Sequence, residues 1–351
     1  HGINQCFLGH VAHSVRFIVC DFLPYENVDE QKGAKRMRVL ITGAAGDIGS
    51  RLVTFFANNK DVTLFTTDLT KPLIVGDYTH QNFDVRDPNF FEWVKEICPH
   101  VVVHLASIIQ LPAKMLRSDA YAIDVLATKN LMEACLEIDV KKVVLTSSGA
   151  AYGYWKDNAD WLTEDMPIRG NEDYFYSSHK RQVEELMSHY RKYQPQLKQV
   201  ILRPGTVLGP NFQNPITNMF AQKSITGIRG CDSPFVIIWV DDLVAYLIES
   251  VMGEIEGVYN VAGDGTMSLH AIAKRLNKSY IAWPSWLLRG LLSVLKPLKL
   301  SQYGAEQVKF IEFRPVLDND KIKRNFKHQP SKTTRQAFES FLEESNKNYV
   351  A

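Results

Sequence analysis

The stretch Arg38-Val-Leu-Ile-Thr-Gly-Ala-Ala-Gly-Asp-Ile-Gly49 decides the fold of this 351-residue chain. Its first five residues are mainly apolar, which predicts a buried parallel strand. Glycines then stand at Gly43, Gly46 and Gly49, and they open a helix predicted over residues 48–58. Glycines at a strand-to-helix turn let the backbone approach a phosphate, and the free N–H groups of the helix face its charge. The stretch therefore predicts a dinucleotide-binding turn.

Strands and helices alternate downstream of this turn, which predicts an α/β, Rossmann-type doubly wound parallel sheet. We expect a nucleotide-binding core over residues 37–210. We also expect a smaller C-terminal lobe over 211–345 that mainly binds substrate, with 235–262 returning to the core. Residues 1–36 match nothing downstream and form an N-terminal extension of unknown status. The further predicted elements are strands at 62–68, 101–106, 142–147 and 199–203, the end of a strand at 82–85, and helices at 121–138 and 176–193.

Asp68 ends the second predicted strand, 19 residues after Gly49. A carboxylate at this point accepts hydrogen bonds from the ribose hydroxyls and repels a 2′-phosphate. NAD is therefore the expected cofactor. Arg51 keeps NADP as the second choice, although on the first helix it can equally face solvent. A simpler role for Asp68 is that of a solvated acid in a turn.

Tyr176 and Lys180 lie four residues apart in Tyr-Ser-Ser-His-Lys, which places both on one face of a helix. A nearby ammonium favours an ionised phenol, whose pKa is otherwise near 10. The pair by itself is a weak pattern, because any helix can carry it by chance. Downstream of a dinucleotide-binding turn it predicts acid/base chemistry coupled to hydride transfer.

The bulk composition excludes several classes of protein. A formal net charge of +1 gives no reason to expect nucleic-acid binding. The five cysteines are scattered without a Cys-x-x-Cys, so we predict neither a disulfide framework nor a metal site. No run of about 20 apolar residues predicts a transmembrane helix. We therefore expect a cytoplasmic protein that binds a small-molecule substrate.

Read in order, these and further motifs resemble the extended short-chain dehydrogenase/reductases, the NAD-dependent epimerase/dehydratase family. The resemblance covers about residues 37–342. Its motifs are Thr42-Gly-Ala-Ala-Gly-Asp-Ile-Gly49, Asp84-Val85, His104-Leu-Ala-Ser107, Thr146-Ser-Ser-Gly-Ala-Ala-Tyr-Gly153, Leu202-Arg-Pro-Gly-Thr-Val-Leu-Gly-Pro210 and Trp239-Val-Asp-Asp-Leu243. So many matches in one order are more specific than any one of them.

The resemblance implies a role for each matching residue. Tyr176 would be the catalytic acid/base, Lys180 would lower its pKa and hold the nicotinamide ribose, and Ser148 would bind the reacting oxygen. Ser147 is the alternative to Ser148, because register is easily misjudged in a run of small residues. The implied cofactor-binding residues are Gly43, Ala45, Gly46, Asp47, Ile48, Gly49, Asp68, Asp84, Val85, Leu105, Ala106, Ser107, Tyr176, Lys180, Arg203 and Pro204.

The chain also departs from the family pattern. Asp124 stands where many relatives have asparagine, and Ala127 where they have glycine. Trp239 replaces a histidine, and no Arg-Asp pair precedes it, which leaves Arg229 as the only cation near this place. Sugar-nucleotide epimerases commonly use an arginine there for the diphosphate. No Asp-Glu pair follows Ser148, so we do not expect a nucleotide-sugar dehydratase.

Residues 283–300 form the most apolar stretch of the second half. Trp286, Leu287, Leu291 and Leu295 would share one helical face. We expect this face to pack in the core of the lobe; the next choices are a pocket for an apolar substrate and, with Arg289, Lys296 and Lys299, peripheral contact with a membrane.

The expected function is that of an NAD-dependent oxidoreductase acting on a secondary alcohol or ketone of a partly apolar metabolite. One alternative is a nucleotide-sugar epimerase with tightly bound NAD, which would use the same Ser148, Tyr176 and Lys180. The other is a non-catalytic dinucleotide-binding regulator. The resemblance also implies a homodimer formed through paired helices.

Overall fold

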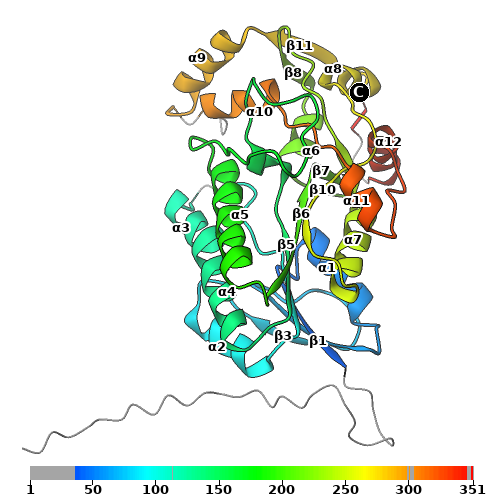
Figure 1. Cartoon of the computed structure of the whole chain (residues 1–351). Coiled ribbons are helices and arrows are strands. Elements are labelled where there is room, and N and C mark those ends of the chain that lie inside the picture. The colour runs from blue at the N-terminus through cyan, green and yellow to red at the C-terminus, as the bar shows by residue number, and fades with distance from the viewer. Residues whose placement is uncertain (1–35, 113, 299, 301–303, 346–348, 351) are drawn as a thin grey trace, which may run out of the picture. The chain divides into compact units, whose positions relative to one another are not determined.

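The central feature of the fold is a seven-stranded parallel sheet with strand order β10-β6-β5-β4-β1-β2-β3, seen in the computed structural model (Figure 1). The structure describes residues 36–112, 114–298, 300, 304–345 and 349–350. This order confirms the predicted doubly wound sheet, because the chain winds outward from β1 in both directions. The strands of the sheet are β1 (Met37–Thr42), β2 (Val62–Asp68), β3 (Thr79–Asn82), β4 (Val101–His104), β5 (Lys142–Thr146), β6 (Lys198–Pro204) and β10 (Gly257–Val261).

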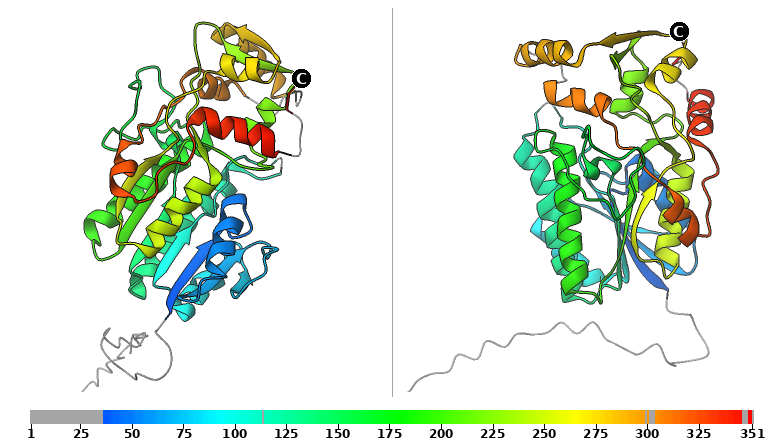
Figure 2. Two further views of the ribbon diagram at one scale, coloured as in Figure 1. Left: turned by 90° about the vertical axis from the view of Figure 1, so that its right-hand side faces the viewer. Right: turned by 45° about the horizontal axis from the view of Figure 1, so that its top comes forward.

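Helices cover both faces of this sheet (Figure 2). On one face pack α1 (Asp47–Phe56) and α7 (Val240–Met252). On the other face pack α2 (Pro88–Ile97), α4 (Ala127–Glu137) and α5 (Phe175–Tyr193). A parallel sheet needs this double cover, because both of its faces are apolar.

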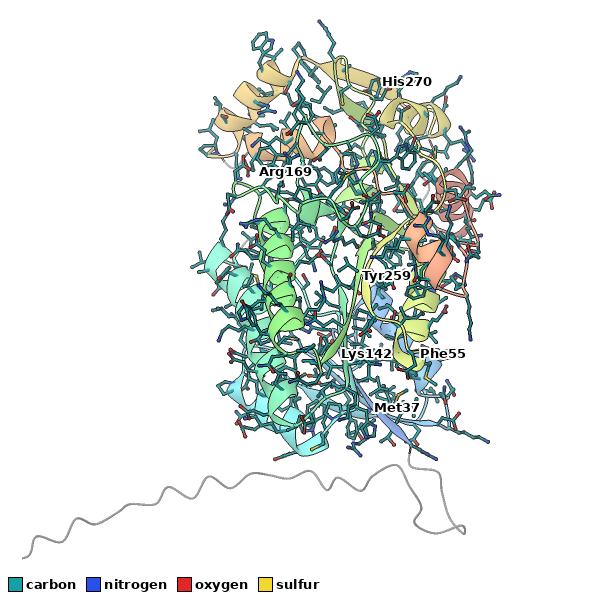
Figure 3. The ribbon with its side chains drawn as sticks, viewed as in Figure 1. Met37, Phe55, Lys142, Arg169, Tyr259 and His270 are labelled. Carbon is teal, nitrogen blue, oxygen red and sulfur yellow. The ribbon has the colours of Figure 1, made fainter. Side chains whose placement is uncertain are left out.

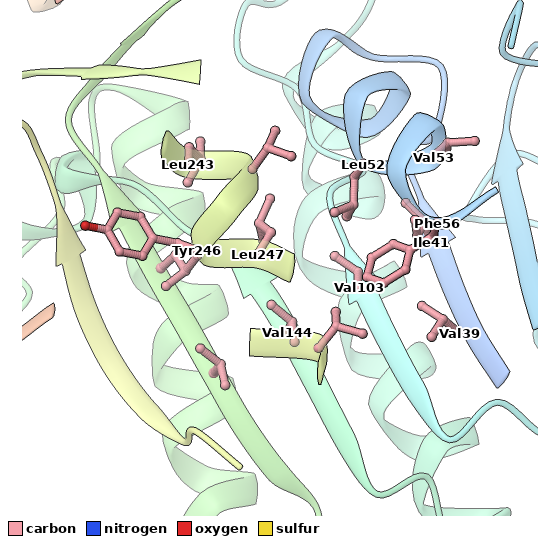
Figure 4. Packing of buried hydrophobic residues seen from close by; sticks show 14 of the residues in the cluster. Val39, Ile41, Leu52, Val53, Phe56, Val103, Val144, Leu243, Tyr246 and Leu247 are labelled. Carbon is pink, nitrogen blue, oxygen red and sulfur yellow. The ribbon is translucent and has the colours of Figure 1, made fainter. Parts of the chain in front are cut away.

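The apolar strand sequences account for the two layers. Successive side chains of a strand point to opposite faces. Val39 and Ile41 of β1 therefore pack on the side of α1 and α7, as Figure 4 shows, while Leu40 packs with α2 and α4. The same alternation divides Val102 of β4 from Val103. One continuous apolar run thus supplies both cores.

The carboxyl ends of the strands face the smaller, C-terminal part of the molecule. Met37 and Lys142 mark the amino ends of β1 and β5, and His270 on α8 lies at the opposite end (Figure 3). This part contains two two-stranded sheets and short helices: β7 (Thr206–Leu208), β9 (Ile237–Trp239), β8 (Ser224–Ile228), β11 (Ser279–Trp283), α6 (Pro215–Phe220), α8 (Leu269–Arg275), α9 (Ser285–Leu295), α10 (Val308–Glu312) and α12 (Thr334–Glu344).

Residues 240–261 return to the large sheet. Helix α7 packs on it, and β10 adds its last strand beside β6. Strand β9 pairs with β7 instead, outside the large sheet. Helix α11 (Asp320–Asn325) packs against β10, and its Ile322 joins the same core. The last part of the chain therefore contributes to the core of the large sheet, in addition to forming a separate core of its own.

Two predicted elements differ from the structure. The third strand ends at Asn82 and not at Val85 as predicted, because the Asp84 side chain already forms a turn with the backbone N–H and the guanidinium of Arg86. The helix predicted over residues 121–138 consists of α3 (Arg117–Tyr121), a π-helical segment at Ala122–Leu126 and then α4. A π-helical segment inserts an extra residue per turn and changes which side chains face inward.

The expected packing of residues 283–300 in the core is wrong for one helical face. Trp286 is 74% exposed, and Leu287 and Leu291 are exposed with it. Instead, Leu288 and Leu292 hold α9 in place by packing against Ile228 and Val308. Only one side of this short helix meets the rest of the lobe, so most of its apolar residues face solvent.

Candidate active site

The glycine turn between β1 and α1 is tightly packed. Gly43 has a φ of 68°, and a Cβ there would lie 2.7 Å from the backbone nitrogen of Ala106. A Cβ on Gly49 would lie 2.1 Å from the carbonyl oxygen of Gly43. Gly46 caps α1 without a side-chain hydrogen bond, which leaves the first N–H groups of the helix for a ligand. The turn fits the pyrophosphate of a dinucleotide.

The acids near the turn favour an unphosphorylated ribose. The Asp68 carboxylate accepts hydrogen bonds from the backbone N–H groups of Ala45 (2.9 Å) and Leu69 (2.7 Å), and so holds the turn closed. Arg51 donates to Asp241 at 3.0 Å, so its guanidinium is engaged away from a 2′-phosphate. This arrangement suits NAD rather than NADP.

Asp84 follows the end of β3 at Asn82. It accepts two hydrogen bonds from the guanidinium of Arg86, at 2.9 and 2.6 Å. These bonds hold the pKa of Asp84 below its usual value. A carboxylate held in this way can accept a hydrogen bond from a ligand but does not compete for a proton near neutral pH.

A cavity of about 440 Å³ runs from the glycine turn to the C-terminal part. It brings together all but two of the residues that the sequence analysis selects. Ala45 and Arg203 do not line it. The selected residues that do are Gly43, Gly46, Asp47, Ile48, Gly49, Asp68, Asp84, Val85, Leu105, Ala106, Ser107, Ser148, Tyr176, Lys180 and Pro204.

Tyr176 lies in the first turn of α5, at the edge of this cavity. Burial raises its pKa to about 12, although a hydrogen bond with Ser148 works in the opposite direction. The shift is therefore opposite to the lowering by Lys180 that the sequence analysis expects. The Lys180 ammonium lies 5.7 Å from the centre of the Tyr176 ring and donates to the carbonyl oxygen of Thr146 at 3.1 Å.

The two neighbouring serines have different surroundings. Ser148 lines the cavity, accepts a hydrogen bond from the Ala150 N–H at 3.1 Å and reaches Tyr176. Ser147 also belongs to the cavity lining, but its hydroxyl donates to the buried carboxylate of Glu184. The geometry therefore favours Ser148 as the serine that meets a substrate.

Arg203 belongs to the same buried group as Glu184. Its guanidinium donates two hydrogen bonds to the Glu184 carboxylate through Nε and a third, at 2.6 Å, through a terminal nitrogen. It also donates to the Tyr152 hydroxyl at 2.7 Å. Arg203 thus ties β6 to α5 behind the site, whereas its neighbour Pro204 lines the cavity.

Arg314 is a cavity residue that the sequence analysis does not select. Its guanidinium carbon lies 3.7 Å from the ring centre of Phe235 and 4.4 Å from that of Phe310. One terminal nitrogen donates to Thr206 at 3.1 Å, while Nε and the other terminal nitrogen have no hydrogen-bond partner in the described part of the chain.

No carboxylate in the part of the chain that the structure describes forms an ion pair with Arg314. Burial lowers its pKa to about 10, so it stays protonated at neutral pH. In the sequence, only Arg229 stands near Trp239. Arg314 follows 75 residues later and comes close to that segment only in the folded protein, so no local sequence motif indicates that it belongs to the site.

The described residues contain no group of three or more His, Cys, Asp or Glu side chains that could hold a metal ion. Among the same residues, no helix combines the length and the apolar character needed to cross a membrane.

A doubly wound sheet with a glycine turn and a cavity at its carboxyl ends defines a dinucleotide-binding α/β protein. Residues 39–241 match the model of the NAD dependent epimerase/dehydratase family. Because this match spans more than half of the chain, the protein belongs to that family. The cofactor of this protein is NAD, and the members of the family are enzymes.

Individual relatives agree with this assignment. An uncharacterised protein of Mycobacterium tuberculosis is 22% identical over 313 residues, which cover 87% of this chain and 83% of that protein. The UDP-glucose 4-epimerase of Mycolicibacterium smegmatis is 31% identical over 54% of this chain and 64% of its own length.

A solved structure shares the fold. It is a variant of the UDP-glucuronic acid 4-epimerase from Bacillus cereus, in complex with UDP-4-deoxy-4-fluoro-glucuronic acid and NAD. It is 19% identical, has a TM-score of 0.67 and covers 88% of this chain and 98% of that one.

Proposed function

We propose that this protein is an NAD-dependent enzyme that oxidises a secondary alcohol of a nucleotide sugar, and that it acts as an epimerase. The observation that carries the proposal is the Arg314 guanidinium in the same cavity as Tyr176, because two of its nitrogens have no hydrogen-bond partner among the described residues. The apolar stretch at 283–300 suggested an apolar substrate, but none of its residues is among those that line the cavity. The names of several relatives agree with a nucleotide sugar.

The side chains can carry the proton steps. In the oxidation, the Tyr176 oxygen accepts the hydroxyl proton while Ser148 donates a hydrogen bond to the forming carbonyl oxygen. NAD, when bound, supplies the hydride acceptor. Return of the hydride to the opposite face, with the proton given back by Tyr176, yields the epimer and leaves no net redox change.

Two charges help Tyr176 to act as a base despite its burial. Tyr176 is the second residue of α5, and the positive end of a helix dipole favours a negative charge there. Lys180 stands one turn further along and adds its ammonium at 5.7 Å from the ring. Both favour the phenolate, against the burial that raises the pKa.

Arg314 fits the diphosphate of such a substrate. Nε and one terminal nitrogen are buried without an acceptor, which two phosphate oxygens would supply after a local shift of the side chain, and guanidinium suits bidentate contacts of this kind. The guanidinium also lies within cation–π distance of the rings of Phe235 and Phe310. These contacts keep the charge beside the cavity before the substrate arrives.

The first test is turnover. Purified protein incubated with UDP-glucose should form the C4 epimer, followed by nuclear magnetic resonance. Tyr176→Phe should slow the reaction by about 10²–10⁴-fold, the usual effect of losing an acid/base group. Tyr193→Phe is the matched control, because Tyr193 lies exposed on the same helix. Full activity of Tyr176→Phe would show that the catalytic assignment is wrong.

The second test concerns Arg314. We expect Arg314→Leu to raise KM for the nucleotide sugar by about tenfold or more, because a charge-assisted contact is lost. Affinity for NAD should change little. Arg229→Leu, at an exposed arginine outside the cavity lining, should leave KM unchanged. An unchanged KM in Arg314→Leu would rule out a diphosphate contact at this residue.

A further inference from the structure

A buried histidine and a buried carboxylate form a pair behind the catalytic helix. His179 Nδ1 and Asp124 Oδ2 lie 2.8 Å apart. The two side chains are only 7% and 4% exposed. Because a carboxylate can only accept, the hydrogen of this bond belongs to His179. His179 directly precedes Lys180, so the pair meets α5 at the catalytic lysine.

The second oxygen of Asp124 holds the loop that follows β4. Oδ1 accepts hydrogen bonds from the Ser107 hydroxyl at 3.0 Å and from the Ile108 N–H at 2.9 Å. Both residues line the cavity on the cofactor side. A single carboxylate thus joins the loop at 107–108 to the helix that carries Tyr176 and Lys180.

The π-helical segment at Ala122–Leu126 makes this contact. π-helical turns inside longer helices are frequent at functional sites. The Asp124 carbonyl oxygen accepts a hydrogen bond from Thr128, whose hydroxyl also contacts His104 at 3.0 Å. The position of Asp124 is therefore fixed from its own helix as well as from its two partners.

Asp124 also acts on the site through its charge. It opposes the lowering of the Lys180 pKa by burial and contributes to the raised pKa of Tyr176. Other titratable groups surround the same place from β4, α3, α5 and the loops. They are His104, Tyr121, Tyr154, Tyr174, His179, Glu184 and Arg314.

We propose that Asp124 and His179 form a positioning pair. It locks the cofactor-lining loop at Ser107 to the catalytic helix and places a negative charge behind Lys180. The proposal rests on the proposed roles of Tyr176 and Lys180. The proposal gives His179 a role of its own. Although His179 lies between Tyr176 and Lys180 in the sequence, its side chain leaves the helix on another face than theirs.

The first experiment measures NAD affinity, which needs no substrate. His179→Phe keeps a ring but removes the hydrogen bond, and should weaken NAD binding by about tenfold, as expected for a bond to a charged partner. His179→Asn can still donate at the Nδ1 position and should restore most of the affinity. His189→Phe, at an exposed histidine on the same helix, should bind NAD normally.

The second experiment measures the pH profile of epimerisation by Asp124→Asn. Asparagine still accepts from Ser107 and Ile108 but carries no charge. Because the negative charge raises the pKa of Tyr176, its removal should lower that pKa. The rise of kcat/KM that follows deprotonation of Tyr176 should therefore move to lower pH.

The outcomes separate the two proposals. Loss of turnover in Tyr176→Phe with normal NAD affinity in His179→Phe would overturn the positioning pair alone. An unmoved pH profile in Asp124→Asn would overturn the role of its charge. A lower melting temperature with both readouts unchanged would reduce the pair to a structural contact. If Tyr176→Phe stays active, the proposed function fails, and the NAD affinities still decide whether the pair orders the loop.

Discussion

Ser147 and Ser148 are adjacent in the sequence, and their side chains have different partners. Ser147 ends in the buried group of Glu184 and Arg203, and Ser148 faces Tyr176 across the cavity. Along an extended backbone, neighbouring side chains point in opposite directions. One of two adjacent serines must therefore be structural when the other faces a ligand.

This division predicts opposite results for the two alanine variants. Ser148→Ala should lower kcat by about 10²–10³-fold, as expected for loss of a donor to a developing negative oxygen, with little change in stability. Ser147→Ala leaves a buried acceptor with one partner fewer and should cost about 1–3 kcal/mol in the free energy of unfolding. Turnover assays and urea denaturation of both variants check this, and the reverse pattern would make Ser147 the catalytic serine.

The sequence could predict the residues whose roles depend on local motifs. The glycine turn, Asp68, Ser148, Tyr176 and Lys180 each lie at a strand end or on a helix face that periodicity locates. Arg314 has no such signal, because its site needs Phe235 and Phe310 to be brought together by the fold. The sequence also could not predict that the pKa of Tyr176 is raised, because this shift depends on how deeply the side chain is buried.

At the scale of elements, the Glu184–Arg203 ion pair fastens α5 to β6. Both side chains are almost completely buried, and Arg203 also contacts Tyr152. Burial acts to lower the pKa of Arg203, but the charge and hydrogen bonds of Glu184, together with those of Tyr152, outweigh it and raise that pKa above its usual value. Such a pair holds two elements in one register, and removal of either partner leaves a buried charge alone.

Glu184→Gln should therefore lower the free energy of unfolding by about 3–5 kcal/mol. The double variant Glu184→Met with Arg203→Met replaces the pair by apolar side chains and should recover much of that loss. Urea denaturation of the three proteins measures both effects. A double variant as unstable as the single one would mean that the remaining contacts of Arg203 carry the stabilisation.

Helix α9 shows that a sequence pattern can predict a helix without predicting which of its faces is buried. Its apolar spacing correctly indicates a helix, and half of that helix remains exposed. Periodicity shows which residues share a face, but only the neighbours in space determine whether the face is covered. The π-helical segment before α4 is a similar case, because an inserted residue leaves the overall helical pattern intact.

At the scale of the whole molecule, His104 lies in the middle of the large sheet, where β4 pairs with β1. Its ring contacts Thr42 of β1 at 2.8 Å and Thr128 of α4 at 3.0 Å. Burial lowers its pKa from 6.5 to about 4, and the charge of Lys180 acts in the same direction. The folded protein therefore keeps His104 neutral at pH values where an unfolded chain would protonate it.

This difference predicts acid sensitivity. The stabilisation from neutral His104 is complete above pH 6.5 and is lost as the pH falls towards about 4, with a total on the order of 3 kcal/mol. His104→Gln should flatten the pH dependence of stability in that window, whereas His189→Gln should not. Denaturation curves at several pH values measure this, and equal slopes for the two variants would contradict it.

The position of β10 in the sheet has a consequence for the order of synthesis. Strand β6 is complete at Pro204, but its neighbour β10 begins only at Gly257. Until the ribosome has released that segment, the backbone edge of β6 is open to pairing with other chains. The family match ends at residue 241, so a fragment cut at that boundary keeps this open edge permanently. The smallest piece in which the edge of β6 is covered and all seven strands are present therefore extends to at least Val261.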